Sequence, residues 1–267
     1  MRLTLRGVTL LNTAESMKII RKILRRSGGA AQLEIWDDHM NRIALTDVLT
    51  AFRSPAQFQR ELAALIDARA EGGNCKIVEV GCETAVTTLL LSEMNEKTVI
   101  DINQRAISLV EAAAAQLDKK VRALVCDMFT MPFRNAEFDI VFNAGVIEHF
   151  SMEERAQALF EYARIMRDNG VMIIAFPNHY CPPYRFAYLT MRLLGVWRFP
   201  SEYKIRDLGV EARQSGLRVV ERLTISRGTI FNWLDFLPPA RALFRLFDRF
   251  FHYEGYLTVV ILSKSHA

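Results

Sequence analysis

Short apolar runs alternate with amphipathic segments from residue 76 onward. Five such runs precede residue 180: 76–80, 97–101, 121–127, 138–145 and 171–178. Segments 84–95, 103–117 and 153–168 repeat apolar residues at helical spacing instead. A helix over 204–215 and two strands over 217–225 and 255–264 are expected to follow. Alternation of this kind predicts an α/β fold with a doubly wound, mostly parallel sheet and right-handed crossovers.

The first 73 residues have a helical pattern and supply no strand. Residues 13–26 predict an amphipathic helix that carries five basic side chains. Ser54 and Pro55 predict the cap and the first position of a later helix, which ends before Gly72. We therefore expect an N-terminal helical extension over 1–73 and a second domain over 74–267.

Two segments of the second domain are longer than a minimal sheet requires. Residues 179–203 are rich in aromatic side chains and follow the fifth strand, and residues 228–252 precede the last strand. Ligands of open α/β sheets bind outside the carboxyl ends of the strands. We expect these two insertions, together with the N-terminal helices, to form the walls of a substrate pocket.

A nucleotide-type ligand is predicted beside the first two strands. Gly81 begins a small-residue turn after the first strand, and Asp101 ends the second strand. An acid about twenty residues after such a glycine binds ribose hydroxyls at the edge of a doubly wound sheet. The ligand is therefore expected across residues 79–83 and Asp101.

The turn also discriminates between two ligands of this type. A dinucleotide site needs Gly-x-Gly-x-x-Gly so that the backbone can approach a pyrophosphate, but here Glu83 and Ala85 follow Gly81. A desolvated carboxylate beside a pyrophosphate is strongly unfavourable. S-adenosylmethionine has an adenosine, an ammonium and a sulfonium, and it tolerates Glu83 better than NAD does. We favour S-adenosylmethionine and keep an NAD-dependent oxidoreductase as an alternative.

Composition narrows the function further. The 267 residues are 51% hydrophobic and 24% charged, with a net charge of +4. The chain has no tract of like charges and no basic stripe interleaved with aromatics, so a nucleic acid partner is disfavoured. The four cysteines lack zinc-site spacing, and no metal is expected. A cytoplasmic location is expected because no signal peptide and no membrane-spanning apolar run is visible.

Several motifs, taken in order, carry a family resemblance. EVGCETA (79–85) resembles the first motif of the class I S-adenosylmethionine-dependent methyltransferases of the small-molecule, type 11 kind, although Glu83 and Ala85 depart from its glycines. VIDIN and VCDMF match the family's acids after the second and third strands. MPFRNAEFDIVFNAGVIEHF and FEYARIMRDNGVMIIAFPN look like its fourth-strand segment and its Glu-x-x-Arg helix with the fifth strand. The resemblance covers residues 76–225.

This resemblance implies a Rossmann-like, seven-stranded sheet whose last strand is antiparallel and inserted beside the sixth. It also implies methyl transfer from S-adenosylmethionine to a nucleophile. The aromatic insertions favour a partly apolar acceptor, methylated at oxygen or nitrogen: a small or lipid-linked natural-product, glycolipid or polysaccharide intermediate. A non-catalytic scaffold or partner subunit with the same fold is a second alternative, because the first motif is degenerate.

Site residues are expected at the strand ends that carry these motifs. The candidate cofactor ligands are Glu79, Gly81, Cys82, Glu83, Asp101, Ile102, Asp127, Met128, Asn143 and Ala144. His149 is the candidate catalytic base, and Glu148, His179 and Tyr180 are candidate substrate contacts. Structural roles stay open for several of them: Asp101 as a helix cap, Gly81 as a tight turn only, Glu79 as a ligand of its own turn, Asp127 as a loop cap, Glu83 as a solvated helix-start residue, and His149 as a helix start.

The helix expected after Pro238-Pro239 allows two interpretations. Its apolar face is wide, and its arginines recur at every fourth position. The apolar members are Leu243, Phe244, Phe247, Phe250 and Phe251. Such a helix either packs on the sheet, closes the substrate pocket or forms a homodimer, or it lies on anionic lipid at the inner face of a membrane.

Overall fold

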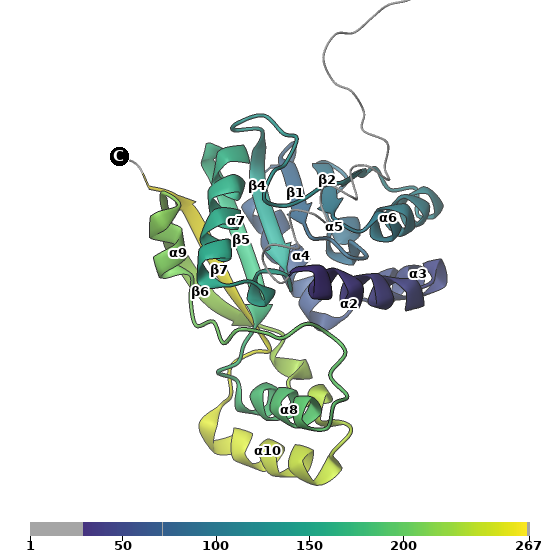
Figure 1. Ribbon diagram of the computed structural model, residues 1–267, viewed down its shortest axis with the longest axis vertical. Coiled ribbons are helices and arrows are strands. Elements are labelled where there is room, and N and C mark those ends of the chain that lie inside the picture. Colours follow the sequence, from purple (N-terminus) through teal and green to yellow (C-terminus); the bar gives the residue numbers. More distant parts are fainter. Residues whose placement is uncertain (1–28, 71, 266–267) are drawn as a thin grey trace, which may run out of the picture.

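A seven-stranded sheet forms the centre of the computed structural model, which describes residues 29–70 and 72–265 (Figure 1). The strand order is β3-β2-β1-β4-β5-β7-β6, and β7 is antiparallel to both of its neighbours. The expected doubly wound sheet with an inserted antiparallel last strand is confirmed. The strands are β1 (Lys76–Val80), β2 (Glu96–Asp101), β3 (Arg122–Val125), β4 (Phe138–Ala144), β5 (Met166–Pro177), β6 (Leu217–Ile225) and β7 (Leu257–Lys264).

Helices cover both faces of the sheet because the central strands are apolar on both sides. In β1, Val78 and Val80 pack in the cluster of α7 (Met152–Ile165), whereas Ile77 packs in that of α4 (Gln57–Arg69). The other helices are α2 (Gly29–Arg42), α3 (Leu45–Arg53), α5 (Val86–Leu90), α6 (Gln104–Gln116), α8 (Pro182–Leu193), α9 (Gly209–Gln214) and α10 (Pro238–Phe251). Short 3-10 turns span Ile147–His149, Arg227–Thr229 and Asn232–Leu234.

Several expected helix boundaries were wrong, each for a local reason. Ser54 ends α3 instead of capping α4, which begins after Ala56, where the Gln59 side chain accepts from the Ala56 amide. Helix α5 has only five residues, because the chain turns again after Leu90. Strand β5 begins at Met166, inside the segment expected to be helical, and α9 is shorter than 204–215.

The N-terminal helices that the structure describes lie beside the sheet and supply no strand, as expected. The basic helix expected over 13–26 lies outside the described residues. Helix α2 is attached to the loops at the carboxyl ends of the strands. Gln32 donates to the His149 carbonyl at 2.9 Å, and Arg105 donates to the Met40 carbonyl at 2.7 Å.

A separate helical layer, α8 and α10, extends beyond one end of the sheet (Figure 1). Their inner sides enclose a small core of Cys181, Tyr184, Ile230 and Tyr253. Packing of α10 against the sheet was one of the expectations, and it is wrong: none of the residues of α10 is buried. Within residues 29–70 and 72–265, no helix has the length and apolar content needed to cross a bilayer.

Candidate active site

A first cavity opens at the carboxyl ends of β1 to β4, where the sequence predicts the cofactor. It encloses about 950 Å³, including its mouth to solvent. Seven of the expected cofactor ligands line it: Gly81, Glu83, Asp101, Ile102, Asp127, Met128 and Ala144. Residues of α2 supply a wall that the sequence did not indicate: Gln32, Leu33, Trp36 and Met40.

The turn after β1 has a left-handed backbone at three positions, and two of the three residues there are not glycine. Gly81 has φ +71°, and a Cβ there would lie 2.6 Å from Val146 Cγ2. Glu83 and Ala85 both have φ 50°, a left-handed conformation that L-residues adopt at a cost. The turn therefore has left-handed conformations at Gly81, Glu83 and Ala85, although only the first of these is a glycine.

Asp101 holds this turn and also faces the first cavity. Its Oδ2 accepts from the Glu83 amide and its Oδ1 from the Asn103 amide, both at 2.9 Å. Burial raises the pKa of Asp101 to about 6. Each carboxylate oxygen has a second lone pair, so hydroxyl donors of a ribose can still bind. The alternative role as a helix cap belongs instead to Asn103, whose side chain accepts from the first amides of α6.

Asp127 and Met128 lie on the loop after β3, at the other end of the first cavity. Asp127 Oδ1 accepts from the Phe129 amide at 2.9 Å, and burial raises the pKa of Asp127. Met128 Sδ accepts from the buried Tyr162 hydroxyl at 3.3 Å. An acid and a thioether at this position can contact the amino group and the face of an adenine.

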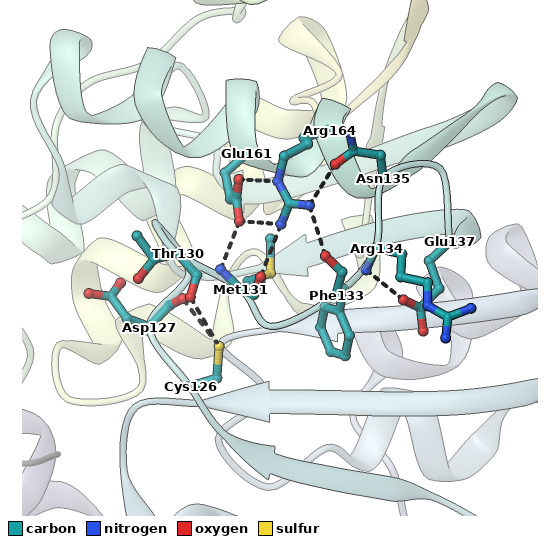
Figure 2. Close-up of polar contacts among 10 residues, drawn as sticks. All are labelled: Cys126, Asp127, Thr130, Met131, Phe133, Arg134, Asn135, Glu137, Glu161 and Arg164. Atoms are coloured by element: carbon teal, nitrogen blue, oxygen red, sulfur yellow. Dashed lines mark hydrogen bonds and ion pairs between the residues drawn. The ribbon is translucent and has the colours of Figure 1, made fainter. Parts of the chain in front are cut away.

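Two residues of α7 fix the loop that carries Asp127 (Figure 2). Arg164 donates to the carbonyls of Met131 and Phe133 at 3.0 and 2.8 Å. Glu161 accepts from the Met131 amide at 2.7 Å and from Arg164. The Glu-x-x-Arg pattern of the sequence therefore anchors the loop that carries Asp127.

A second cavity of about 1030 Å³, including its mouth, adjoins the first. Six residues line both cavities: Trp36, Gly81, Glu83, Ala144, Gly145 and His149. The second cavity has an aromatic wall made of Trp36, Phe58, Trp197, Phe199, Trp233 and Tyr256. Five of these six aromatic residues come from the N-terminal helices and from segments 179–203 and 228–252, for which the sequence predicts the walls of a substrate pocket. The sixth, Tyr256, lies just after the last of these segments.

Glu79, Cys82 and Glu148 open into the second cavity instead of the first. Glu79 accepts from Thr88 Oγ1 at 2.5 Å, and burial raises its pKa to about 8. Glu148 is 2% exposed, and its Oε2 has no hydrogen-bond partner among residues 29–70 and 72–265. Burial, and then the nearby charge of Glu202, raises the pKa of Glu148 well above its usual value.

His149 lies at the boundary between the two cavities. Its Nδ1 is 3.2 Å from the Ser201 carbonyl, and because a carbonyl only accepts, the proton belongs on Nδ1. Nε2 then carries a free lone pair when the ring is neutral. Burial lowers the pKa of His149, so this neutral form dominates at pH 7.

Three expected site residues line neither cavity. Asn143 is buried behind the site and donates to the Val80 carbonyl at 3.0 Å. His179 is buried, and its Nε2 lies 2.9 Å from Glu202 Oε2. It therefore contacts a residue that lines the second cavity without lining the cavity itself. Tyr180 is 42% exposed and packs under the Lys204 ammonium.

Charge and aromatic contacts from α2 close the region around the turn. His39 Nε2 lies 2.6 Å from Glu83 Oε1, and the His39 ring contacts Phe199. Trp36 meets the His149 ring edge-on at a centroid distance of 5.5 Å. Glu83 therefore has a partner within the chain, a role that the sequence did not suggest.

Comparison with known proteins finds similarity over part of this chain. A methyltransferase-domain family model matches residues 78–174. The chain is 39% identical over 67 residues to a Mus musculus protein named "Probable tRNA methyltransferase 9B", covering 25% of this chain and 14% of that protein. It is 26% identical over 103 residues to a Mycolicibacterium smegmatis protein named "Probable S-adenosylmethionine-dependent methyltransferase", covering 38% of each. The chain thus spans less than half the length of these relatives.

A solved structure of low identity shares the fold over almost the whole chain. Magnesium protoporphyrin IX methyltransferase from Synechocystis PCC 6803, solved with bound SAH, superposes with a TM-score of 0.56 at 13% identity. The match covers 93% of this chain and 99% of that one. The family's cofactor is S-adenosylmethionine, and the first cavity suits it, with a glycine turn too tight for a Cβ and two half-buried acids at its ends. Residues 78–174 thus match a methyltransferase-domain family, and the chain shares the fold of the class I S-adenosylmethionine-dependent methyltransferases.

Proposed function

We propose that this protein transfers a methyl group to an oxygen or nitrogen of a small, partly apolar acceptor that binds in the second cavity. The observation that carries the proposal is the shared boundary of the two cavities. Ala144, Gly145 and His149 line both, so ligands in the two cavities approach each other there. Holding two reactants in alignment can lower the activation free energy by about 7–11 kcal/mol.

The residues of the first cavity suit S-adenosylmethionine in a defined orientation. Asp101 would bind the ribose hydroxyls, and Asp127 and Met128 would contact the adenine. When bound, this cofactor supplies an electrophilic methyl group on a sulfonium. The backbone around Gly81 and Ala144 would lie at its methionine end, close to the boundary with the second cavity.

The second cavity favours a flat, apolar acceptor with one hydrogen-bonding group. Trp197, Trp233 and Tyr256 give it broad apolar surfaces. Glu148 Oε2 is buried there without a partner among the described residues, and such an atom costs about 1–3 kcal/mol until it is paired. A hydroxyl or amine of the acceptor would pair with it.

His149 is the proposed base for this acceptor. Methylation of a hydroxyl releases its proton, and His149 Nε2 offers a free lone pair at the cavity boundary. The Ser201 carbonyl orients the ring, so Nε2 cannot exchange places with Nδ1 without losing that bond.

Transfer to tRNA is a second candidate, because relatives are named as tRNA methyltransferases. Their similarity covers at most 37% of this chain. A cavity walled by aromatic side chains supports a small acceptor more than a folded nucleic acid.

Label transfer from methyl-tritiated S-adenosylmethionine separates these candidates. The full chain is incubated either with a total lipid and small-metabolite extract or with bulk tRNA, and the label is followed into each fraction. We expect label in the extract and none in tRNA, and no transfer by a Trp197→Ala/Trp233→Ala variant that still binds cofactor. Label in tRNA contradicts the proposed acceptor class. Cofactor binding without transfer to either pool identifies a non-catalytic protein.

A further inference from the structure

Helix α10 exposes a continuous apolar face. Five of its large side chains, Leu243, Leu246, Phe247, Phe250 and Phe251, are between 40% and 73% exposed. Leu243, Leu246, Phe247 and Phe250 follow a spacing of i, i+3, i+4 and i+7, which places them on one side of the helix. Soluble monomers rarely expose a contiguous group of this kind without a binding role.

Helix α8 extends the same surface. Phe186 of α8 contacts Phe244 of α10 at a ring-centroid distance of 5.5 Å, which joins the two helices. Beyond this contact the chain exposes four further apolar side chains between 49% and 87%: Leu189, Leu193, Leu194 and Val196. These residues and the five of α10 are called the apolar face below. Figure 1 shows α8 and α10 together at the outer end of the molecule.

Basic side chains border the apolar face, and the acids near it are paired. Arg241, Arg245 and Arg249 recur every four residues along α10. Of the two acids in 227–252, Asp235 pairs with Arg241 at 2.6 Å and Asp248 with Arg227 at 3.1 Å. Segment 182–200 has three arginines and no acid. The border of the face therefore carries an excess of positive charge.

We propose that the apolar face docks this protein onto the surface of a bilayer that contains anionic lipid. An amphipathic helix with arginines beside a Leu/Phe face lies in the headgroup region, where its apolar side chains reach the acyl chains. Lipid phosphates supply negative charge to Arg245 and Arg249, which have no acidic partner among residues 29–70 and 72–265, whereas Arg241 pairs with Asp235. A second copy of the chain fits less well, because it would bring another set of arginines to the same border.

Docking would place the second cavity close to the bilayer. Val196 of the apolar face directly precedes Trp197, which lines that cavity together with Phe199. An acceptor with a lipid tail could reach the cavity along segment 193–199. Docking itself does not depend on the proposed methyl transfer.

Vesicle co-sedimentation of the full chain, without cofactor, tests the docking. We expect binding to phosphatidylcholine vesicles that contain phosphatidylglycerol, weak binding to phosphatidylcholine alone, and release by salt. Phe247→Ser/Phe250→Ser should weaken binding by about tenfold or more. Met94→Ser/Phe160→Ser, at positions 64% and 63% exposed elsewhere, is the matched control and should not change binding.

A charge pair of variants completes the test. Arg245→Gln/Arg249→Gln should weaken binding about fivefold for each arginine removed. Arg213→Gln/Arg218→Gln removes the same charge from exposed sites outside the apolar face and should leave binding unchanged. Equal vesicle binding by the wild type and both α10 variants overturns the proposal. So does a wild-type dimer that Phe247→Ser/Phe250→Ser converts to a monomer while no variant binds vesicles.

Discussion

Glu83 and Ala85 adopt a backbone conformation that favours glycine, in a turn whose path the cofactor site requires. Their φ of 50° matches the requirement that the family motif meets with glycine. The Glu83 side chain contacts His39. The backbone conformation of Glu83 shapes the turn and also places this residue in the wall of the first cavity.

Two substitutions at residue 83 isolate the backbone strain. Glu83→Gly and Glu83→Ala both remove the His39 contact, and only glycine relieves the left-handed conformation. We expect the glycine variant to be about 1 kcal/mol more stable than the alanine variant, measured by chemical denaturation. Equal stability would mean that this turn is not strained in solution.

The pH dependence of turnover identifies the base. Burial lowers the pKa of His149 below 6.5, so the neutral ring predominates above that pH and is lost as the pH falls through its lower folded-state value. At saturating cofactor, kcat should therefore be flat from neutral pH upward and should fall only on the acidic side.

His149→Asn should reduce kcat by about a hundredfold and remove the acidic limb. His252→Gln changes an exposed histidine outside both cavities and serves as the control. An acidic limb that persists in His149→Asn would assign the titration to another group, such as Asp101, whose pKa is raised to about 6.

The site residues that could be predicted from the sequence are those that directly follow a strand, because the end of the strand determines where they lie in the fold. Gly81, Asp101 and Asp127 follow apolar strands, and the carboxyl ends of parallel strands meet at one edge. Trp36, His39 and Glu202 were missed because their position depends on long-range packing. The second cavity was indicated only by the two insertions, 179–203 and 228–252, and by the N-terminal helices, without the individual residues that line it.

At the scale of elements, α7 controls the cofactor site without contributing a side chain to it. Its Glu161–Arg164 pair holds loop 126–137 by backbone contacts (Figure 2). Hydrogen bonds from Arg164, aided by its charge, lower the pKa of Glu161 although burial alone would raise it. This contribution to stability is present near neutral pH and is lost as the pH falls through the lowered pKa.

Arg164→Lys should loosen this loop. Lysine keeps the charge but cannot donate to Met131, Phe133 and Glu161 in one planar geometry. We expect a loss of about 1–3 kcal/mol in unfolding free energy and weaker cofactor binding, measured by denaturation and calorimetry. Arg167→Lys, at a partly buried ion pair with Asp139 that does not touch this loop, should leave cofactor affinity unchanged. A normal cofactor affinity in Arg164→Lys would show that the loop is held by other contacts.

Helix and strand identities were predictable because periodicity reports burial on the sheet. The errors fell where a local signal competed with tertiary packing. Ser54-Pro55 resembles a helix start, yet the cap of α4 is Ala56, two residues later, whose amide donates to the Gln59 side chain. The apolar periodicity of α10 was equally consistent with a buried helix and with a helix that faces lipid. Periodicity shows that a helix has an apolar face but not what covers that face.

At the scale of the molecule, the two cavities lie side by side at the carboxyl ends of the strands, and the outer helices determine which ligands can enter them. The first cavity lies over β1 to β4, and the second lies between α2 and the segments that carry α8 and the Asn232–Leu234 turn. The apolar face lies on the same helical layer as the wall of the second cavity. Recognition of cofactor, of acceptor and of a membrane surface would thus be divided among three parts of one chain.

Calorimetric titration with S-adenosylmethionine tests the central claim most directly, with Asp101→Ala as the variant and Asp38→Ala, at a position whose side chain is 75% exposed, as the control. Melting in the absence of cofactor verifies that both variants fold. We expect one saturable site in the wild type and the control, no binding of NAD, and an affinity lower by more than tenfold, about 1.4 kcal/mol, in Asp101→Ala. Unchanged affinity in folded Asp101→Ala, or binding of NAD in place of S-adenosylmethionine, would contradict the account.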